Sequence, residues 1–199
     1  MTQQLILASG SPARRALLGA TGLTFDVLRA ELDEEAAAAP LEESNASPAD
    51  IAAALAMAKA LTVSEQYPEA LVIAADQTLE CEGELLRKAD DMGEARRQLL
   101  RLSGRTHFLH AALACAEAGQ IVFEAQESAA LALRQLSPEE VGRYLAFAGE
   151  EVLSSVGLYQ FEGPGIRLMQ RVDGDYFTIL GLPLMPLLAF LRERGIGTF

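Results

Sequence analysis

The chain has 199 residues and a formal net charge of −12, because 28 aspartate and glutamate residues outnumber 16 lysine and arginine residues. This balance argues against a nucleic-acid-binding protein, which needs a broad basic surface to contact phosphates. Half of the residues are hydrophobic, which provides enough apolar material for a sizeable core and argues against wholesale disorder. We expect a single domain over residues 1–199.

The apolar segments are too short or too interrupted to cross a membrane, which requires roughly 20 residues. Residues 71–75 form one such segment, and Pro183 and Pro186 interrupt another at residues 182–191. The N-terminus has no positive charge before its first apolar segment, so no secretory signal is predicted. Cys81 and Cys115 form no CxxC pair or cysteine/histidine cluster, which fits a reduced cytoplasm. The sequence therefore predicts a cytoplasmic protein without a membrane or nucleic-acid partner.

The first part of the chain predicts a strand, a tight loop and a helix. An apolar strand over residues 5–8 leads through Ser9-Gly10-Ser11-Pro12 into a helix over residues 13–20. Ser11 is a favourable N-cap, and proline suits the first helical position. A second strand over residues 25–29 is followed by an acidic, alanine-rich segment that we expect to be a loop up to Ser47-Pro48.

The next part combines a helix with a buried strand. Residues 50–66 have helical apolar spacing, and Ile51, Leu55 and Lys59 follow one another at i, i+4, which places a lysine at the end of an apolar stripe. Residues 71–75 are continuously apolar, as in a strand buried on both faces that ends at Asp76.

The remaining elements predict a mixed sheet. We expect a helix over residues 93–101, strands over 107–115 and 121–133 joined by a hairpin turn, and a helix after Ser137-Pro138 with Glu140 completing a capping box. A glycine-rich region, a short helix from Pro164, a strand over 176–180 and a closing helix from Pro183 follow. Alternating strands and helices with one hairpin indicate an α/β fold with a mixed sheet.

The loop from Ser9 to Pro12 and the two arginines after it form a candidate phosphate cradle. A helix N-terminus favours an anion, and the planar donors of Arg14 and Arg15 suit phosphate oxygens. A capped helix with solvated arginines is the commoner explanation of such a segment.

Lys59 must either reach water or meet an anion in a partly buried site. Lys88 is a further candidate cation, although a solvated loop residue would look the same.

Asp76 is the strongest single candidate for a functional residue. A carboxylate after a buried strand should be partly buried and should have a cation or metal nearby, because an uncompensated buried charge is costly. A turn or capping aspartate is the alternative. Asp33 and Glu34 could join Asp76 around a divalent metal, since Mg²⁺ is usually held by one or two carboxylates and substrate phosphates. A solvated acidic loop explains Asp33 and Glu34 almost as well.

The two histidines predict no active site. His107 and His110 are three positions apart in a strand, so they point to opposite faces, and we interpret both as structural. The sequence has no Gly-x-Ser-x-Gly elbow, Walker-type loop or His-Glu-x-x-His motif, so serine hydrolase, P-loop and zincin functions have no support.

An ordered set of motifs resembles the Maf family of nucleotide pyrophosphatases. The opening segment from Leu5 to Pro12 with Arg14-Arg15 is similar to the family's signature. Further blocks that match in the same order are Asp33-Glu34, Ala56-x-x-Lys59-Ala60, Ala75-Asp76-Gln77, Leu102 to His107, Glu162-Gly163 and Gly174-Asp175-Tyr176 through Leu184.

The resemblance implies an α/β fold with a central mixed sheet flanked by helices and two lobes around a substrate cleft, as in inosine triphosphatases. It implies hydrolysis of a nucleoside triphosphate to the monophosphate and pyrophosphate with a divalent metal, Mg²⁺ or Mn²⁺, and without an organic cofactor. Asp76 matches the family's catalytic base, and we place the metal at Glu34 and Asp76. The positions that match phosphate ligands are Ser9, Arg14, Arg15, Lys59 and Lys88.

Three positions match residues that are linked to the choice of nucleotide substrate in the family. Gln77 and Glu162 resemble the branch that acts on 7-methylguanosine triphosphate, whereas a threonine and a glutamine there would resemble the dTTP and UTP branch. Ala13 matches a third variable position and replaces a larger residue. The loop around Lys88 reads Arg-Lys-Ala where the family usually has Gly-Lys-Pro.

Two alternatives remain open at this point. One is a dTTP or UTP pyrophosphatase of the same family, and the other is a nucleotide-binding regulator of cell division without significant turnover. The expected partner is a nucleoside triphosphate, and the sequence leaves a homodimer open.

Overall fold

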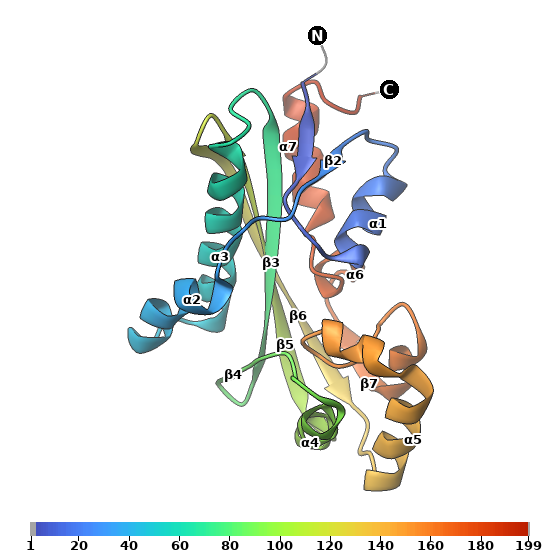
Figure 1. The fold of residues 1–199 in the computed structure, drawn as a ribbon. Coiled ribbons are helices and arrows are strands. Elements are labelled where there is room, and N and C mark those ends of the chain that lie inside the picture. The colour runs from blue at the N-terminus through green and yellow to red at the C-terminus, as the bar shows by residue number, and fades with distance from the viewer. Residues whose placement is uncertain (1–2, 199) are drawn as a thin grey trace. The chain divides into compact units, whose positions relative to one another are not determined.

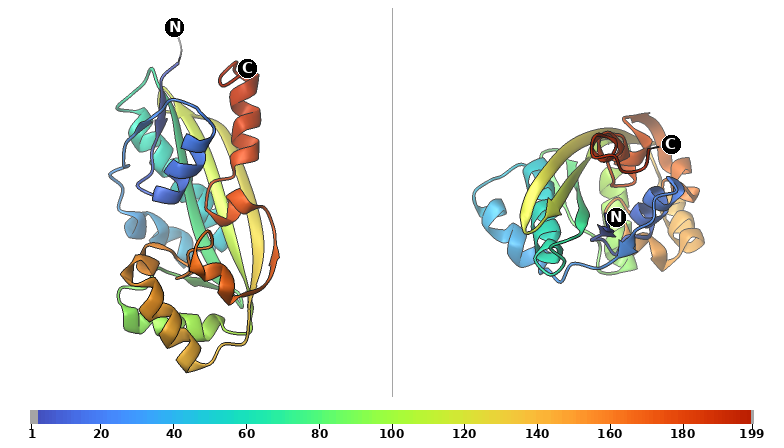
Figure 2. Two further views of the ribbon diagram at one scale, coloured as in Figure 1. Left: turned by 90° about the vertical axis from the view of Figure 1, so that its right-hand side faces the viewer. Right: turned by 90° about the horizontal axis from the view of Figure 1, so that it is seen from above.

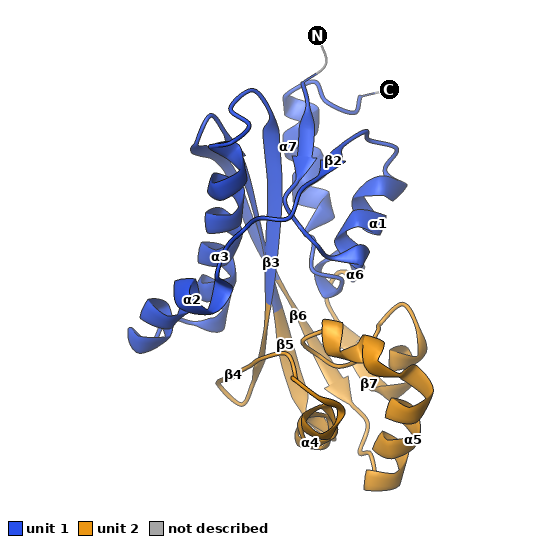
Figure 3. Cartoon of the chain, in the orientation of Figure 1, with its two compact units in different colours: residues 1–77, 110–127, 176–199 blue, residues 78–109, 128–175 orange. Residues whose placement is uncertain are grey.

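A computed structural model describes residues 3–198 of the chain. These residues form two compact units, which Figure 3 shows in separate colours. Unit 1 consists of the chain up to Gln77, His110–Glu127 and the segment from Tyr176 onward. Unit 2 consists of Thr78–Leu109 and Ser128–Asp175. The chain therefore passes several times between the units, and β3, β5 and β6 contribute residues to both.

The strands form a mixed sheet, as the sequence predicts. Its order is β2-β1-β3-β5-β6-β7, and β4 pairs with β3. The strand β1 is parallel to both β2 and β3, whereas the β3/β4 and β6/β7 pairs are antiparallel. The strands are β1 (Leu5–Leu7), β2 (Asp26–Val27), β3 (Leu71–Cys81), β4 (Glu84–Leu86), β5 (Thr106–Glu117), β6 (Gln120–Leu133) and β7 (Met169–Asp173).

In unit 1, helices cover both faces of the strands (Figures 1 and 2). Its helices are α1 (Pro12–Ala20), α2 (Glu34–Glu43), α3 (Pro48–Ser64), α6 (Tyr176–Ile179) and α7 (Leu184–Glu193). Successive residues of a strand point to opposite faces. Leu7 accordingly packs in the cluster that contains Leu18 of α1 and Leu187 of α7, whereas Ile6 packs in the cluster that contains Ala56 of α3.

The helix α3 lies close to the sheet because small residues form its inner face. Ala52, Ala56 and Ala60 recur every four residues and are fully buried against β1, β3 and β5. The neighbouring stripe, Ile51 and Leu55, is also buried. A long side chain that continues this stripe therefore begins inside the protein.

The two α-helices of unit 2 have side-chain N-caps. Its helices are α4 (Met92–Leu102), α5 (Pro138–Ala148) and the 3₁₀ helices η1 (Glu150–Ser154) and η2 (Pro164–Leu168). The predicted capping box of α5 is confirmed: the Glu140 amide donates to Ser137 Oγ at 3.2 Å, and the Ser137 amide donates to Glu140 Oε2 at 2.8 Å. Asp91 caps α4 in a similar way, because its Oδ1 accepts from the Glu94 amide at 2.8 Å.

Three predicted elements are wrong. The acidic, alanine-rich segment is the helix α2 and not a loop, because Asp33 caps it by accepting from the Ala36 amide at 3.0 Å and alanine has the highest helix propensity. The strand β3 continues to Cys81, so Asp76 lies inside the strand and not at its end. Residues 176–179 form the short helix α6 in place of a strand, although their aromatic and β-branched side chains favour a strand, and β7 precedes them.

No helix within residues 3–198 combines the length and the apolar character that crossing a membrane requires.

His107 is a fully buried histidine in β5. Its Nε2 forms a hydrogen bond with the Tyr159 hydroxyl at 2.6 Å, whereas its Nδ1 is buried without a hydrogen-bond partner among the described residues. Burial lowers the pKa of His107 to about 4. The imidazole is therefore neutral at pH 7, in agreement with a structural role.

We predict that His107 makes the protein less stable as the pH falls from about 6.5 to about 4. In this window the unfolded chain binds a proton at His107 that the folded chain does not, which costs about 2 kcal/mol at pH 5. Urea unfolding at pH 7 and pH 5 measures this difference. A His107→Phe/Tyr159→Phe variant, in which neither polar group remains, should lose about that part of the pH dependence. An unchanged pH dependence in the variant would contradict this assignment.

Candidate active site

The ammonium group of Lys59 is buried between two carboxylates. Lys59 continues the Ile51 and Leu55 stripe of α3, and the residue is only 7% exposed. Its Nζ donates a hydrogen bond to Asp76 Oδ1 and forms an ion pair with Glu34 Oε1 at 2.9 Å. Of the two alternatives for Lys59, the structure shows the anion, and the prediction that Asp76 has a cation beside it is confirmed.

Asp76 is an acidic residue in the middle of β3. It is 6% exposed, and the five residues before it are fully buried and apolar. A buried carboxylate is stable only when a positive charge and hydrogen bonds replace its hydration. Lys59 provides both, which explains how a charged residue can lie inside this strand.

Glu34 reaches Lys59 from the first turn of α2. Its side chain is 55% exposed, so this second carboxylate lies at the open side of the pair. Asp33 does not join the cluster through its Oδ1, because that atom caps α2. Among the described residues, no group of three or more histidine, cysteine or acidic side chains is arranged to hold a metal ion.

The loop after β1 lies near Asp76 because β1 and β3 are parallel neighbours. Leu7 is paired with Ile73, and the Ala8 amide donates to the Ile73 carbonyl at 2.7 Å, so Ser9 follows β1 at the level of Ala75, the residue before Asp76. Ser9 is buried and its Oγ accepts from the Ser11 amide at 3.2 Å. Ser11 caps α1 as predicted, accepting from the amide of the third helical residue at 3.4 Å.

Arg14 uses its side chain to hold two backbone carbonyls. Its Nη1 donates to the Ala75 carbonyl at 2.6 Å, and its Nε donates to the Gly181 carbonyl at 2.7 Å. Burial lowers the pKa of Arg14, and the negative charges of Asp76 and Glu34 oppose this effect. Arg14 therefore fixes the residue before Asp76, whereas Arg15 is exposed on α1. The phosphate role of both arginines stays a prediction.

The sequence does not identify Gly181 and α6 as part of this region. Gly181 has φ +86°, and a Cβ there would lie 3.2 Å from Arg14 Nη2, so glycine suits both the backbone and the space. Gln77 Nε2 donates to the carbonyls of Thr178 and Ile179 at 2.9 and 3.2 Å. The only feature of the sequence that points to this position is the Gly181-Leu182-Pro183 segment. This segment does not reveal that the Arg14 side chain packs on the glycine.

The remaining candidate residues form no hydrogen bond or ion pair with Lys59 or Asp76 among the described residues. Ala13 is half-buried in the first turn of α1, in unit 1. Lys88 and Glu162 belong to unit 2, where Lys88 is exposed in the loop after β4 and Glu162 is exposed in the turn before η2. The structure thus brings together Ser9, Arg14, Glu34, Lys59, Asp76 and Gln77 in one unit.

The α/β fold and the cluster of cations and carboxylates around Asp76 define a candidate hydrolase for a polyanionic substrate. The chain belongs to the Maf family, because the family described as Maf-like protein matches residues 4–194.

Named relatives align with nearly the whole chain. A 7-methyl-GTP pyrophosphatase of Mesorhizobium japonicum is 50% identical over 98% of both chains, and one of Brucella suis is 51% identical over 98% of both. A nucleoside triphosphate pyrophosphatase of Nitrobacter hamburgensis is 49% identical over 96% of this chain and 94% of that protein. Among solved structures, the Staphylococcus aureus Ham1 protein aligns with a TM-score of 0.42 at 12% identity, over 66% of this chain and 72% of that chain.

We predict strong coupling between Lys59 and Asp76 in the folding stability of the protein. Lys59→Met leaves a buried carboxylate without a partner and should cost about 3 kcal/mol of unfolding free energy. Adding Asp76→Asn removes that charge, so the double variant should be clearly more stable than the sum of the two single changes implies. Denaturant unfolding of all four proteins measures the coupling.

Glu34→Gln is the matched control, because this partner of Lys59 is more than half exposed and its loss should cost less than about 1 kcal/mol. Additive effects of Lys59→Met and Asp76→Asn would contradict the view that the two charges compensate each other.

Proposed function

We propose that this Maf-family chain is a nucleoside triphosphate pyrophosphatase that converts 7-methyl-GTP to 7-methyl-GMP and pyrophosphate. The observation that carries this proposal is the near 50% identity, over 98% of both chains, to proteins named 7-methyl-GTP pyrophosphatases. The buried Asp76 and its cations give the chain groups suited to such a reaction.

Asp76 acts as the general base in this proposal. Lys59 contacts Oδ1, which leaves Oδ2 to accept a proton from a water molecule. The water oxygen attacks the α-phosphorus while the bond from this phosphorus to the bridging oxygen of the β-phosphate breaks. The bridging electron pair leaves with pyrophosphate, and the proton removed from water passes to Asp76.

The cations of the site stabilise the charge that develops on the phosphates. Lys59 lies directly beside Asp76, Arg15 lies on the exposed side of α1, and the N-terminus of α1 adds its own partial positive charge. Ser9 and Lys88 are the further phosphate ligands that we propose. Because the whole chain has a net charge of −12, a triphosphate requires this local group of cations.

Arg14 acts in this proposal mainly as a positioning residue. Two of its donors are already bound to the carbonyls of Ala75 and Gly181, so it holds the backbone next to Asp76. Its charge still contributes to the positive field at the site, and its remaining nitrogen can donate to a phosphate oxygen.

We propose that Glu34 and Asp76 hold a divalent metal, Mg²⁺ or Mn²⁺, together with the substrate. Glu34 and Asp76 supply hard carboxylate oxygens that converge on one ammonium group, and substrate phosphates and water would complete the ligand set. When bound, the metal neutralises phosphate oxygens and so favours attack on phosphorus.

Gln77, Glu162 and Ala13 are the proposed determinants of the base. A carboxylate at Glu162 can accept hydrogen bonds from the N–H edge of guanine and favours the positive charge of a methylated base. Gln77 donates to two carbonyls of α6 through Nε2, which fixes the orientation of its amide. Ala13 has a small side chain in the first turn of α1.

We place the enzyme in the cytoplasm. Cys81 and Cys115 are both buried free thiols, which fits a reducing compartment. A nucleoside triphosphate is the proposed partner, and the homodimer stays a prediction.

We predict that the purified protein, given Mg²⁺ or Mn²⁺, hydrolyses 7-methyl-GTP faster than GTP, UTP, CTP or dTTP and releases monophosphate and pyrophosphate. Asp76→Asn should lower kcat/KM by about 10²- to 10⁴-fold, because it removes the base. Asp26→Asn, at an exposed position of β2 in the same unit, is the matched control and should remain active. Chromatography of the products provides the measurement.

The possible outcomes separate the proposal from its alternatives. Faster dTTP or UTP hydrolysis would keep the reaction and contradict our interpretation of Gln77 and Glu162. Tight nucleotide binding without turnover would contradict the enzymatic function and favour a regulator.

A further inference from the structure

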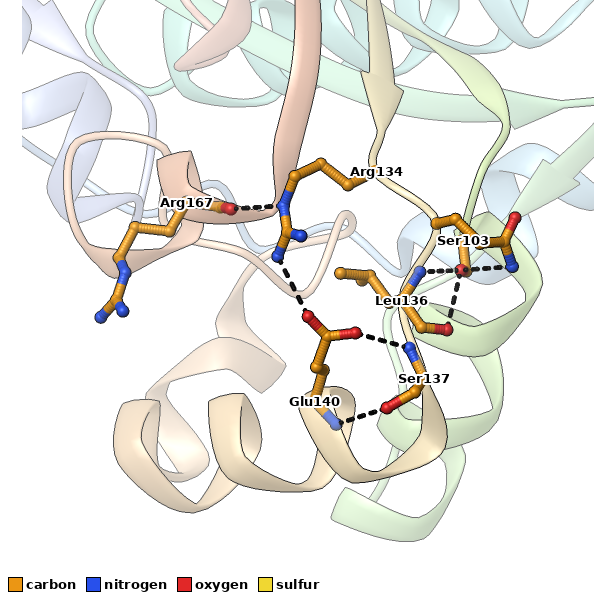
Figure 4. A network of polar contacts seen from close by, with 7 residues as sticks. Ser103, Arg134, Leu136, Ser137, Glu140 and Arg167 are labelled. Atoms are coloured by element: carbon orange, nitrogen blue, oxygen red, sulfur yellow. Dashed lines mark hydrogen bonds and ion pairs between the residues drawn. The ribbon is translucent and has the colours of Figure 1, made fainter.

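Unit 2 contains a cavity of about 350 Å³ between the helix α5 and the 3₁₀ helix η2. We call it the arginine pocket, because Arg134, Arg143 and Arg167 line it together with Glu140 and an apolar wall. Figure 4 shows Arg134 between the carbonyl of Arg167 and the carboxylate of Glu140. The volume lies within the range of small-molecule sites, at its lower end.

One face of α5 forms a wall of the pocket. Glu140, Arg143, Tyr144 and Phe147 line the cavity, and their spacing of three and four residues places them on one side of the helix. Tyr144 is buried and its hydroxyl donates to the Leu158 carbonyl at 3.3 Å. Phe147 is 74% exposed, which is unusual for so large an apolar side chain. The wall therefore runs from charged groups at one end to an accessible aromatic ring roughly 10 Å along the helix.

The charged end of the pocket is held in place before any ligand binds. Arg134 Nε donates to the Arg167 carbonyl at 3.1 Å, and Arg134 Nη2 forms an ion pair with Glu140 Oε1 at 3.5 Å. Glu140 is itself fixed, because its Oε2 accepts from the Ser137 amide in the capping box of α5. Ordered side chains lose less conformational entropy when a ligand arrives.

The other two guanidinium groups make no direct ion pair within residues 3–198, although Arg143 interacts electrostatically with Glu139 and Glu140. Within residues 3–198, the side chains of Arg143 and Arg167 have no hydrogen bond or ion pair, and both are exposed. Three arginines against the single carboxylate of Glu140 give the lining a net charge of +2. Such a concentration of positive charge stands out in a protein whose total charge is −12. The pocket therefore favours an anion with more than one negative charge.

We propose that the arginine pocket binds a nucleoside monophosphate. A phosphate monoester carries a charge of about −1.5 to −2 at pH 7, which matches the lining, and guanidinium groups bind its oxygens in pairs. The aromatic and apolar wall formed by Tyr144, Phe147 and Leu168 suits a planar base attached to that phosphate. The site uses none of the residues that form the cluster around Asp76, and the inference does not rest on the proposed function.

The test is calorimetric titration of the full chain with AMP, ribose 5-phosphate and adenosine. Arg143→Gln and Arg167→Gln should each weaken AMP binding at least about tenfold, because each removes a charged hydrogen-bond donor. Phe147→Ala should weaken binding of AMP but not of ribose 5-phosphate, which has no base. The affinity for AMP should also fall as the salt concentration rises.

Arg171→Gln is the matched control, because this exposed arginine of β7 lies outside the pocket and pairs with Asp173. Backbone amide shifts in the NMR spectrum should locate AMP at α5. The proposal is overturned if neither pocket arginine affects AMP binding, if adenosine binds as tightly as AMP, or if the shifts avoid α5. Failure of the proposed enzyme activity leaves this result unaffected, because the titration requires no turnover.

Discussion

The buried ion pair between Lys59 and Asp76 is the constraint on which the site depends. It joins the middle of β3 to the last part of α3, and Glu34 adds the start of α2 to the same ammonium group. Without Lys59 a carboxylate could not lie inside a buried strand at tolerable cost. The pair therefore explains why the chain can place a base deep in unit 1 and still fold.

The rest of the region supports this pair. Arg14 holds the carbonyl of Ala75, the residue immediately before Asp76, and the same guanidinium group holds the carbonyl of Gly181. Gln77, the residue immediately after Asp76, is held by two carbonyls of α6. The strand is thus fixed on both sides of its charged residue, which is the kind of support that a preorganised catalytic group requires.

Much of the site could be predicted from the sequence, because local rules apply to it. The i, i+4 spacing of Ile51, Leu55 and Lys59 indicates a lysine that begins in the core, and the apolar residues before Asp76 indicate a buried carboxylate. Ser-Pro pairs likewise mark the starts of α1, α3 and α5.

The failures of sequence reasoning have long-range causes. The strand β3 continues through Asp76 to Cys81, where its last residues pair with β4, and Lys59 of α3 compensates the charge that this places inside the strand. The roles of Arg14 and Gly181 depend on a contact between residues 167 positions apart. The helix α2 is not predicted because Pro40 lies inside the segment and proline usually breaks a helix, although the alanines favour one.

The account places the attack of water on the α-phosphorus, and isotope labelling tests this claim most directly. The protein would hydrolyse 7-methyl-GTP in water enriched in ¹⁸O, and mass spectrometry would locate the label. We predict one ¹⁸O atom in 7-methyl-GMP and none in pyrophosphate. Label in pyrophosphate would show attack on the β-phosphorus and would contradict the account.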